Sequence, residues 1–256
     1  MNSAERLFRV YDDFVKHRLP QTPMSQVWAE VFALPKDDPD LEDDVNGCLV
    51  ALRSEVDFAA ERLEVHGVPP NLLHPAFSQL KNVASTAHIH SAWESYRDRI
   101  QSPEHRKILE WACWALRDEA EADMADQDLA ELRAELEALE GRLKEADLSP
   151  YLRSFVQRQV NTMRSALRVY GVQGLQPVHE AFEKVTGAYA AAHPRLDVEF
   201  SAASETGKGA VKNVGDTLRR ISETCGQLDK VVGFTERVWK ITAAAGPALI
   251  AWTSGG

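Results

Sequence analysis

The feature that most constrains the fold is an apolar repeat near the C-terminal end of the chain, in which positions recur alternately three and four residues apart. This spacing keeps side chains on one face of an α-helix, whereas a half-buried β-strand would alternate every second residue. We therefore predict one long amphipathic heptad helix over roughly residues 210–244, with a stripe that packs against another helix. The repeat occupies Val211, Val214, Leu218, Ile221, Cys225, Leu228, Val232, Thr235, Trp239 and Thr242.

Helical spacing also extends through the rest of the chain. A second seam of leucines, three or four residues apart, lies between residues 129 and 143, and Ser149-Pro150 then has the features of a helix start. Because the connection is short, the seam and the following apolar run to Tyr170 are predicted to form an antiparallel helical hairpin over about residues 126–170. The predicted fold class is an all-α multi-helix bundle that includes this hairpin and the long C-terminal helix.

The segment that begins at Ser102-Pro103 differs from its neighbours because it is apolar around more than half of its helical circumference. A helix without a polar face is typical of a protein interior. We therefore expect this helix to be the central and most buried one. Its apolar residues are Ile108, Leu109, Trp111, Ala112, Cys113, Ala115 and Leu116.

Periodicity is lost around residues 194–210, where small and polar residues such as Ser201, Ser204 and Gly209 collect. Such a composition is typical of a linker or a domain edge. The expected organisation is an acidic helical bundle over residues 1–195, a linker over 196–209, and a C-terminal amphipathic helix with a short apolar tail over 210–256.

The net charge of −10 is unevenly distributed. Residues 1–150 carry 16 lysines and arginines against 30 aspartates and glutamates, a net −14, whereas residues 151–256 carry 13 against 9, a net +4. An acidic body repels phosphate backbones and anionic lipid, so nucleic acid is not an expected partner. Contact with an anionic membrane surface would come from the C-terminal part. The split is equally compatible with charge pairing inside the protein.

The cysteines and the first residues of the chain indicate the compartment. Cys48, Cys113 and Cys225 are widely spaced and form no Cys-x-x-Cys pair, which argues against a disulfide scaffold and against a zinc knuckle. The chain reaches Asp12 and Asp13 without the apolar run of a signal peptide. We expect a cytoplasmic protein, and the usage of alanine, arginine and tryptophan indicates a bacterial source.

Motifs that would carry chemistry are weak. Four histidines, His74, His88, His90 and His105, lie within one stretch, but residues two apart on a helix face different sides, so we interpret them as capping or partly buried side chains. The acidic run 37–44 suits a helix N-terminus and lacks the glycine and ligand spacing of a calcium loop.

Residues 206–209, Thr-Gly-Lys-Gly, resemble part of a phosphate-binding loop. They lack its upstream glycine and the serine or threonine that follows the lysine, so a flexible linker is the preferred interpretation. The chain contains no nucleophile elbow, HExxH pair or dinucleotide fingerprint either. We therefore expect no cofactor and no metal.

The heptapeptide Arg99-Ile-Gln-Ser-Pro-Glu-His105 resembles the arginine and histidine motif of the HEPN ribonucleases, all-helical proteins whose paired helices present both residues at a dimer interface. The resemblance implies that His105 transfers a proton and that Arg99 stabilises the phosphate in the transition state. The chain departs from the family pattern because Ser102-Pro103 starts a new helix between the two residues. The polar residue that usually follows the arginine is also absent.

The clearest functional feature of the sequence is therefore an apolar helical surface. The leading interpretation is a non-enzymatic assembly protein whose C-terminal heptad helix binds a second copy or a helix of another protein. A HEPN-like ribonuclease with Arg99 and His105 in its site is one alternative. The predicted partner-binding residues are Val211, Val214, Leu218, Ile221, Leu228, Val232 and Trp239.

The other alternative is a membrane-active effector, either toxin-like or defensive, that is peripheral to the inner membrane. The uncharged stretch from Ile241 to Trp252 is shorter than the roughly 20 residues that a spanning helix needs, and it contains Gly246-Pro247. It can therefore only lie at a lipid interface, where tryptophan side chains are favoured. The candidate interface residues are Phe234, Val238, Trp239, Ile241, Leu249, Ile250 and Trp252.

Overall fold

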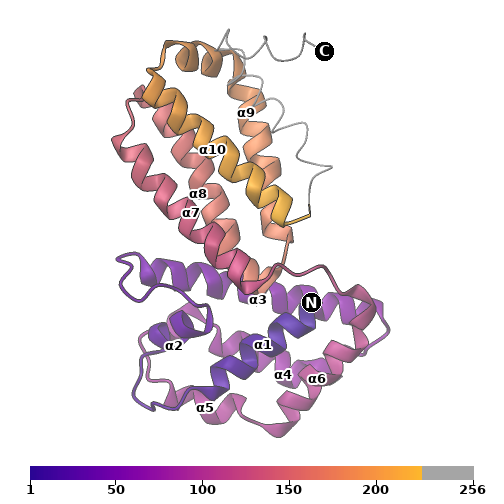
Figure 1. The fold of residues 1–256 in the computed structure, drawn as a ribbon. Coiled ribbons are helices and arrows are strands. Elements are labelled where there is room, and N and C mark those ends of the chain that lie inside the picture. The colour runs from indigo at the N-terminus through magenta and orange to yellow at the C-terminus, as the bar shows by residue number, and fades with distance from the viewer. Residues whose placement is uncertain (227–256) are drawn as a thin grey trace. The chain divides into compact units, whose positions relative to one another are not determined.

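The computed structural model describes residues 1–226, and this part of the chain is all-helical, with ten α-helices, two 3₁₀ turns and no strand (Figure 1). The predicted all-α multi-helix fold is thereby confirmed. The α-helices are α1 (Ser3–Lys16), α2 (Met24–Val31), α3 (Leu41–Val65), α4 (Pro70–Val83), α5 (Glu94–Ile100), α6 (Pro103–Ala115), α7 (Asp126–Glu145), α8 (Pro150–Gln173), α9 (Gln176–Ala202) and α10 (Glu205–Thr224), and the 3₁₀ turns are η1 (Thr86–His88) and η2 (Arg117–Glu119).

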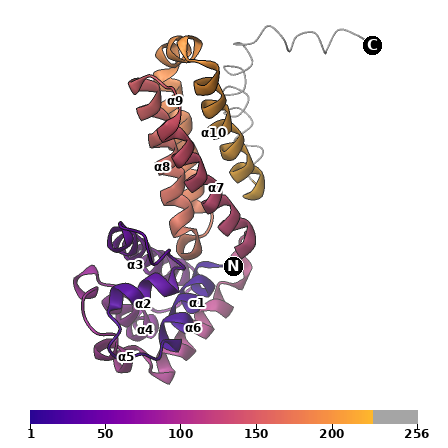
Figure 2. The ribbon, with the colours of Figure 1, turned by 60° about the vertical axis from the view of Figure 1, so that its left-hand side comes forward.

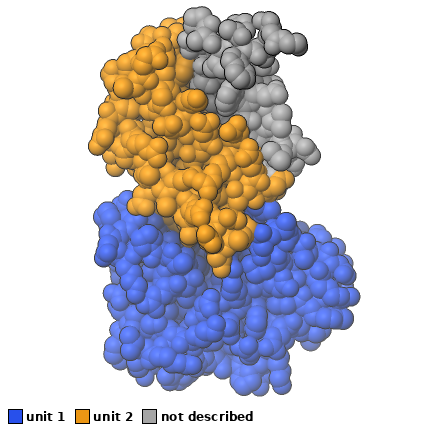
Figure 3. Space-filling view, viewed as in Figure 1, with its two compact units in different colours: residues 1–123, 169–176 blue, residues 124–168, 177–256 orange. Residues whose placement is uncertain are grey.

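The chain forms two compact units, which Figure 3 colours separately. Unit 1 comprises residues 1–123 and 169–176, so it contains α1 to α6 together with the last residues of α8. Unit 2 comprises residues 124–168 and the chain from residue 177 onward. The chain therefore leaves unit 1, returns to it for one short segment, and leaves it again.

Unit 1 is organised around α1. Asn2 caps this helix: its side chain accepts a hydrogen bond from the Glu5 amide, and the Glu5 carboxylate accepts one from the Asn2 amide. This reciprocal cap satisfies two backbone donors that a helix start leaves unpaired. The buried face of α1 meets an aromatic core, in which the Phe14 and Trp28 ring centroids lie 4.5 Å apart. Trp28 and Trp93 are both fully buried, so this core fixes α1 and α2 against the approach to α5.

Unit 2 contains α7, most of α8, α9 and α10, which appear as long helices in Figures 1 and 2. The leucine seam of α7 is buried along its whole length, as its spacing requires for a helix that packs on others. Polar contacts join α7 to α8: the Arg164 Nη1 and Glu140 Oε2 atoms lie 2.6 Å apart, and Arg153 donates hydrogen bonds to the carbonyls of Leu143 and Ala146.

The segment expected to be a linker, 196–209, is helical except for a break of two residues. Helix α9 continues through Pro194 to Ala202, and only Ala203 and Ser204 separate it from α10. Ser204 is the N-cap of α10, since its hydroxyl accepts a hydrogen bond from the Gly207 amide. The small polar residues of this segment thus reflect a helix start, where serine is favoured, and not a flexible chain.

The single helix expected over residues 210–244 is interrupted. Helix α10 ends at Thr224, and Gly226 takes a positive φ of 65°. The Gly226 amide donates to the Glu223 carbonyl, and the Cys225 amide donates to the Ile221 carbonyl. Glycine adopts this left-handed conformation without the cost that a side chain imposes, so it is a common helix terminator. The later part of the predicted helix lies outside the described residues.

Candidate interaction surfaces

The first half of the predicted partner-binding stripe lies on α10 and faces the interior of unit 2. Val214, Leu218 and Ile221 are buried, and Val211 is half-buried. On the same helix, Arg220 forms ion pairs with two residues of α7, Glu131 at 2.8 Å and Glu135. In this structure the stripe is therefore occupied by the protein's own helix, and a partner could reach it only if α10 moved away.

The contacts of α10 with α7 define an antiparallel register. Near its start, Gly207 approaches the loop after α7 so closely that an added Cβ would overlap the carbonyl oxygen of Asp147. Near its end, Arg220 pairs with Glu131 and Glu135. Because α7 begins at Asp126, α10 comes to its end beside the first turns of α7. The two helices thus cover each other over nearly their full lengths.

The second half of the stripe and the whole set of membrane-interface candidates lie outside the described residues. These are Leu228, Val232, Phe234, Val238, Trp239, Ile241, Leu249, Ile250 and Trp252.

Arg99 and His105 lie on different helices, Arg99 in the last turn of α5 and His105 in the first turn of α6. The Arg99 guanidinium lies 5.6 Å from the centre of the Tyr96 ring. The His105 ring nitrogen Nδ1 is 3.3 Å from the Ile100 carbonyl, a group that the end of α5 leaves without a helical partner. Each side chain therefore has its own structural contact, and the ribonuclease site implied by the HEPN resemblance stays a prediction.

Among residues 1–226, no group of three or more His, Cys, Asp or Glu side chains is arranged to hold a metal ion. Of the clustered histidines, His90 lies 3.7 Å from the Glu42 carboxylate, and the His88 ring contacts Tyr96. The acidic run before α3 leads into a first turn that carries Glu42, Asp43 and Asp44. These carboxylates lie where the partial positive charge of a helix N-terminus stabilises them.

No cysteine in the described part of the chain forms a disulfide bond. Burial raises the pKa of Cys225 to about 12. Burial, together with the charge of Glu5, raises the pKa of Cys113 to about 11. Because the thiolate is the reactive form of cysteine, neither residue has the lowered pKa of a nucleophile at neutral pH.

The sequence pattern predicted that α6 is the most buried helix, and this prediction is wrong. Helix α6 lies at the surface of unit 1. Within it, only Leu109 and Ala112 are fully buried, whereas Trp111 and Trp114 are 41% and 61% exposed. The Arg117 guanidinium lies 4.4 Å from the centre of the Trp114 ring and donates to the Trp114 carbonyl. The apolar circumference of α6 thus supplies one face to the core and leaves two large aromatic side chains in solvent.

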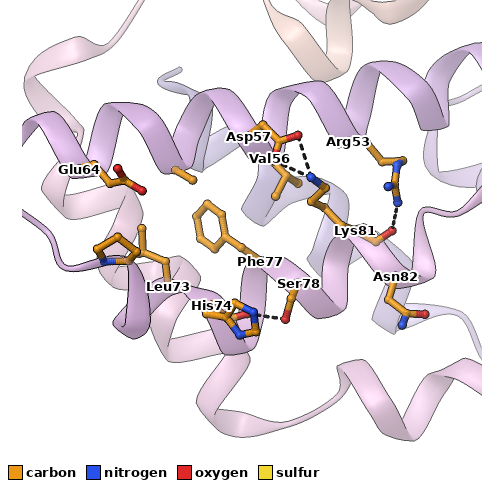
Figure 4. A pocket seen from close by; sticks show the side chains of 12 residues that line it. Arg53, Val56, Asp57, Glu64, Leu73, His74, Phe77, Ser78, Lys81 and Asn82 are labelled. Carbon is orange, nitrogen blue, oxygen red and sulfur yellow. Dashed lines mark hydrogen bonds and ion pairs between the residues drawn. The ribbon is translucent and has the colours of Figure 1, made fainter.

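A groove of about 510 Å³ lies between α3 and α4 (Figure 4). Its apolar lining includes Val56, Leu73 and Phe77, which are themselves nearly fully buried. At one end, Lys81 reaches Asp57 at 2.6 Å, and Arg53 donates a hydrogen bond to the carbonyl of Lys81. The cations that line the groove are thus held by partners within unit 1, and the groove offers a ligand little exposed apolar surface.

No helix within residues 1–226 combines the length and apolar character needed to cross a bilayer. Comparison of the chain with protein-family models, with curated proteins and with solved structures found no match.

Proposed function

We propose that the protein is a non-enzymatic assembly protein, in which unit 2 carries a C-terminal segment that binds a helix of a second copy or of another protein. The observation that carries this proposal is the register of α10 on α7. The stripe of α10 is covered by α7, and α10 ends beside the first turns of α7, yet the apolar repeat of the sequence goes on past Gly226.

In this proposal the two halves of the repeat have different roles. Val214, Leu218 and Ile221 hold α10 in unit 2. Leu228, Val232 and Trp239 are assigned to partner binding, because α7 has no further turns before Asp126 that could cover a continuation of the stripe. An amphipathic segment with an apolar repeat of this spacing is a typical helix-in-groove ligand or coiled-coil strand.

In this proposal, α10 and the segment that follows it are held in place by the predicted antiparallel hairpin of α7 and α8, over about residues 126–170. Three contacts favour it: Arg164 with Glu140, Arg153 with the carbonyls at the end of α7, and Arg133 with the Leu167 carbonyl. They join the start of α8 to the end of α7 and the end of α8 to the first half of α7. Such pairing makes α7 a fixed support for α10.

The test compares the mass of the full chain with that of a chain ending at Gly226, by size-exclusion chromatography with light scattering. A chain ending at residue 200 would be unsuitable, because it removes α10 and uncovers the leucines of α7. We expect the full chain to form a larger assembly than the shorter one. The triple variant Leu228→Ser, Val232→Ser, Trp239→Ser should behave like the shorter chain. Val198→Ser, which removes an exposed apolar side chain of α9, should have no effect.

Equal masses for the full and shortened chains would remove self-assembly. Liposome flotation separates the remaining possibilities. If a peptide of residues 227–256 binds anionic liposomes strongly, and the same peptide with the three serine substitutions does not, the segment is a membrane element. The assembly proposal is then wrong.

A further inference from the structure

The exposed face of α6 carries a stripe of four residues: Lys107, Trp111, Trp114 and Asp118. Lys107, Trp111 and Trp114 are spaced four and three residues apart on α6, which places them in line on one side of this helix, and Asp118 follows in the 3₁₀ turn η2. The helical path continues beyond α6 to Asp118, since the Leu116 amide donates to the Ala112 carbonyl and the Glu119 amide to the Leu116 carbonyl. The side chain of Asp118 is 77% exposed and lies 3.7 Å from the guanidinium of Arg117, which is itself half exposed, and Lys107 is also exposed.

The two tryptophans are not needed to complete the core of unit 1. Leu109, Ala112 and Leu116 already bury the inner face of this helix. Tryptophan is among the residues most enriched at the centres of protein interfaces, and two on one exposed face mark a surface that is covered in an assembly. Arg117 stacks on Trp114, which restricts the ring before binding and lowers the entropy lost on association.

The order of the charges indicates what covers this face. A two-fold axis midway between Trp111 and Trp114 brings Trp111 of one copy against Trp114 of the other, and Lys107 against Asp118 of the other, each contact occurring twice. A parallel arrangement would instead place Lys107 against Lys107 and Asp118 against Asp118. An isologous two-fold interface requires a self-complementary patch of this kind.

We propose that α6 is a homodimer interface, in which the stripe Lys107, Trp111, Trp114 and Asp118 packs antiparallel on the same stripe of a second copy. The acidic character of the first 150 residues disfavours an anionic membrane as the occupant. An interface built from one helix per subunit lies at the small end of specific interfaces, so the dimer dissociates on dilution. This inference concerns unit 1 alone and does not depend on the C-terminal segment.

The charges provide the sharpest test, by sedimentation velocity of the full chain over about a hundredfold range of concentration. Lys107→Glu places a glutamate opposite Asp118, and Asp118→Lys places a lysine opposite Lys107. We expect either variant alone to weaken dimerisation by about tenfold or more, because each substitution turns two attractive pairs into repulsive ones. A mixture of the two variants should restore dimers, since every pair across their shared interface is again of opposite charge.

The tryptophans and a control complete the test. Trp111→Ser with Trp114→Ser should abolish the α6 dimer and leave helicity by circular dichroism unchanged, because both side chains are exposed. Lys184→Glu, the same charge change on exposed α9, should leave dimerisation unchanged.

The inference is overturned if the mass of the full chain does not double as its concentration rises. The starting mass is 28.5 kDa if the chain is a monomer on dilution, and larger if the C-terminal segments already hold copies together. Serine at both tryptophans without effect, or a variant mixture that does not dimerise, overturns it equally. The triple variant at Leu228, Val232 and Trp239 should still show the dimerisation that depends on Lys107 and Asp118. Failure of the C-terminal proposal alone would therefore leave the α6 dimer intact.

Discussion

Arg6 of α1 and Glu55 of α3 form an ion pair whose side chains are only 3% and 4% exposed, with Nη2 and Oε1 2.8 Å apart. Burial raises the pKa of Glu55, and the Arg6 guanidinium opposes that effect. The same guanidinium donates to the Met1 carbonyl and to the Glu121 carboxylate. Arg6 thus ties the first residue of the chain, α3 and the segment after η2 into one polar network of unit 1, in which the Arg6 and Glu55 side chains are buried and Glu121 is exposed.

Removing one partner of this pair should be costly, because it leaves the other charge buried without compensation. We expect Arg6→Met to lower the free energy of unfolding of unit 1 by about 3–5 kcal/mol. Urea unfolding followed by circular dichroism measures it. Lys16→Met, which breaks the surface pairs of Lys16 with Asp12 and Asp13, should cost much less. Similar losses for the two variants would show that the Arg6 network contributes no more than a surface pair.

Any side chain at Gly174, which follows α8, should destabilise unit 1. Its φ is +67°, and an added Cβ would lie 2.7 Å from Arg6 Nη1 and 2.9 Å from a Glu121 carboxylate oxygen. We expect Gly174→Ala to destabilise unit 1 by about 1–2 kcal/mol from the backbone alone, with displacement of the Arg6 network in addition. Gly187→Ala, in the middle of α9 with open space around it, should instead stabilise by up to about 1 kcal/mol. Thermal unfolding of both variants tests this, and the prediction fails if they shift in the same direction.

The helices were predictable because their apolar residues repeat every three or four positions, and this spacing alone excludes strands. The Arg6 and Glu55 pair was not, since it joins residues 49 positions apart and burial of charge leaves no periodic signal. The same limit applies to α6. An apolar circumference predicts burial, yet Trp111 and Trp114 are exposed, because sequence alone does not distinguish a side chain covered by the core from one covered by a partner.

The C-terminal region shows a second limit. The repeat through Cys225 and Leu228 is unbroken in the sequence, yet Gly226 ends α10 between them. One residue with a left-handed φ leaves the apolar spacing unchanged. The glycine and serine content of residues 196–209 predicted a linker for a related reason. Ser204 is the N-cap of α10, and position 207 leaves no room for a side chain because the Asp147 backbone lies against it.

The pH dependence of unit 1 should include a contribution from Glu119. Its pKa is lowered from 4.5 to about 2, mainly by hydrogen bonds from Arg62 and further by His66, against the opposing effect of burial. A carboxyl group with a lowered folded-state pKa stabilises the fold above its unfolded pKa, and this contribution is lost as the pH falls through the folded value.

We therefore expect Glu119→Gln to reduce stability by about 1 kcal/mol at pH 7, as for a partly exposed pair. The difference from the unsubstituted protein should shrink between about pH 4.5 and pH 2. Urea unfolding over this pH series measures it, with Glu61→Gln, exposed on the same helix as Arg62, as the control. A difference that stays constant down to pH 2 would contradict the assignment to Glu119.

The packing of α10 on unit 2 can be tested with two glycines of the same helix. An alanine Cβ at Gly207 would overlap the Asp147 carbonyl oxygen and lie 3.1 Å from Leu148 Cδ2, whereas a Cβ at Gly209 would meet nothing within 4 Å. Backbone cannot yield as a flexible side chain does, so we expect Gly207→Ala to destabilise unit 2 by about 1–3 kcal/mol. Gly209→Ala should stabilise the helix by up to about 1 kcal/mol, because alanine has the higher helix propensity.

Thermal unfolding provides the comparison of the two variants. Binding of a hydrophobic dye should rise only for Gly207→Ala, because a loosened α10 uncovers Val214, Leu218 and Ile221. Equal stability and equal dye binding of the two variants would mean that α10 is not held against α7, and the division of the apolar repeat into a structural half and a partner-binding half would then have to be abandoned.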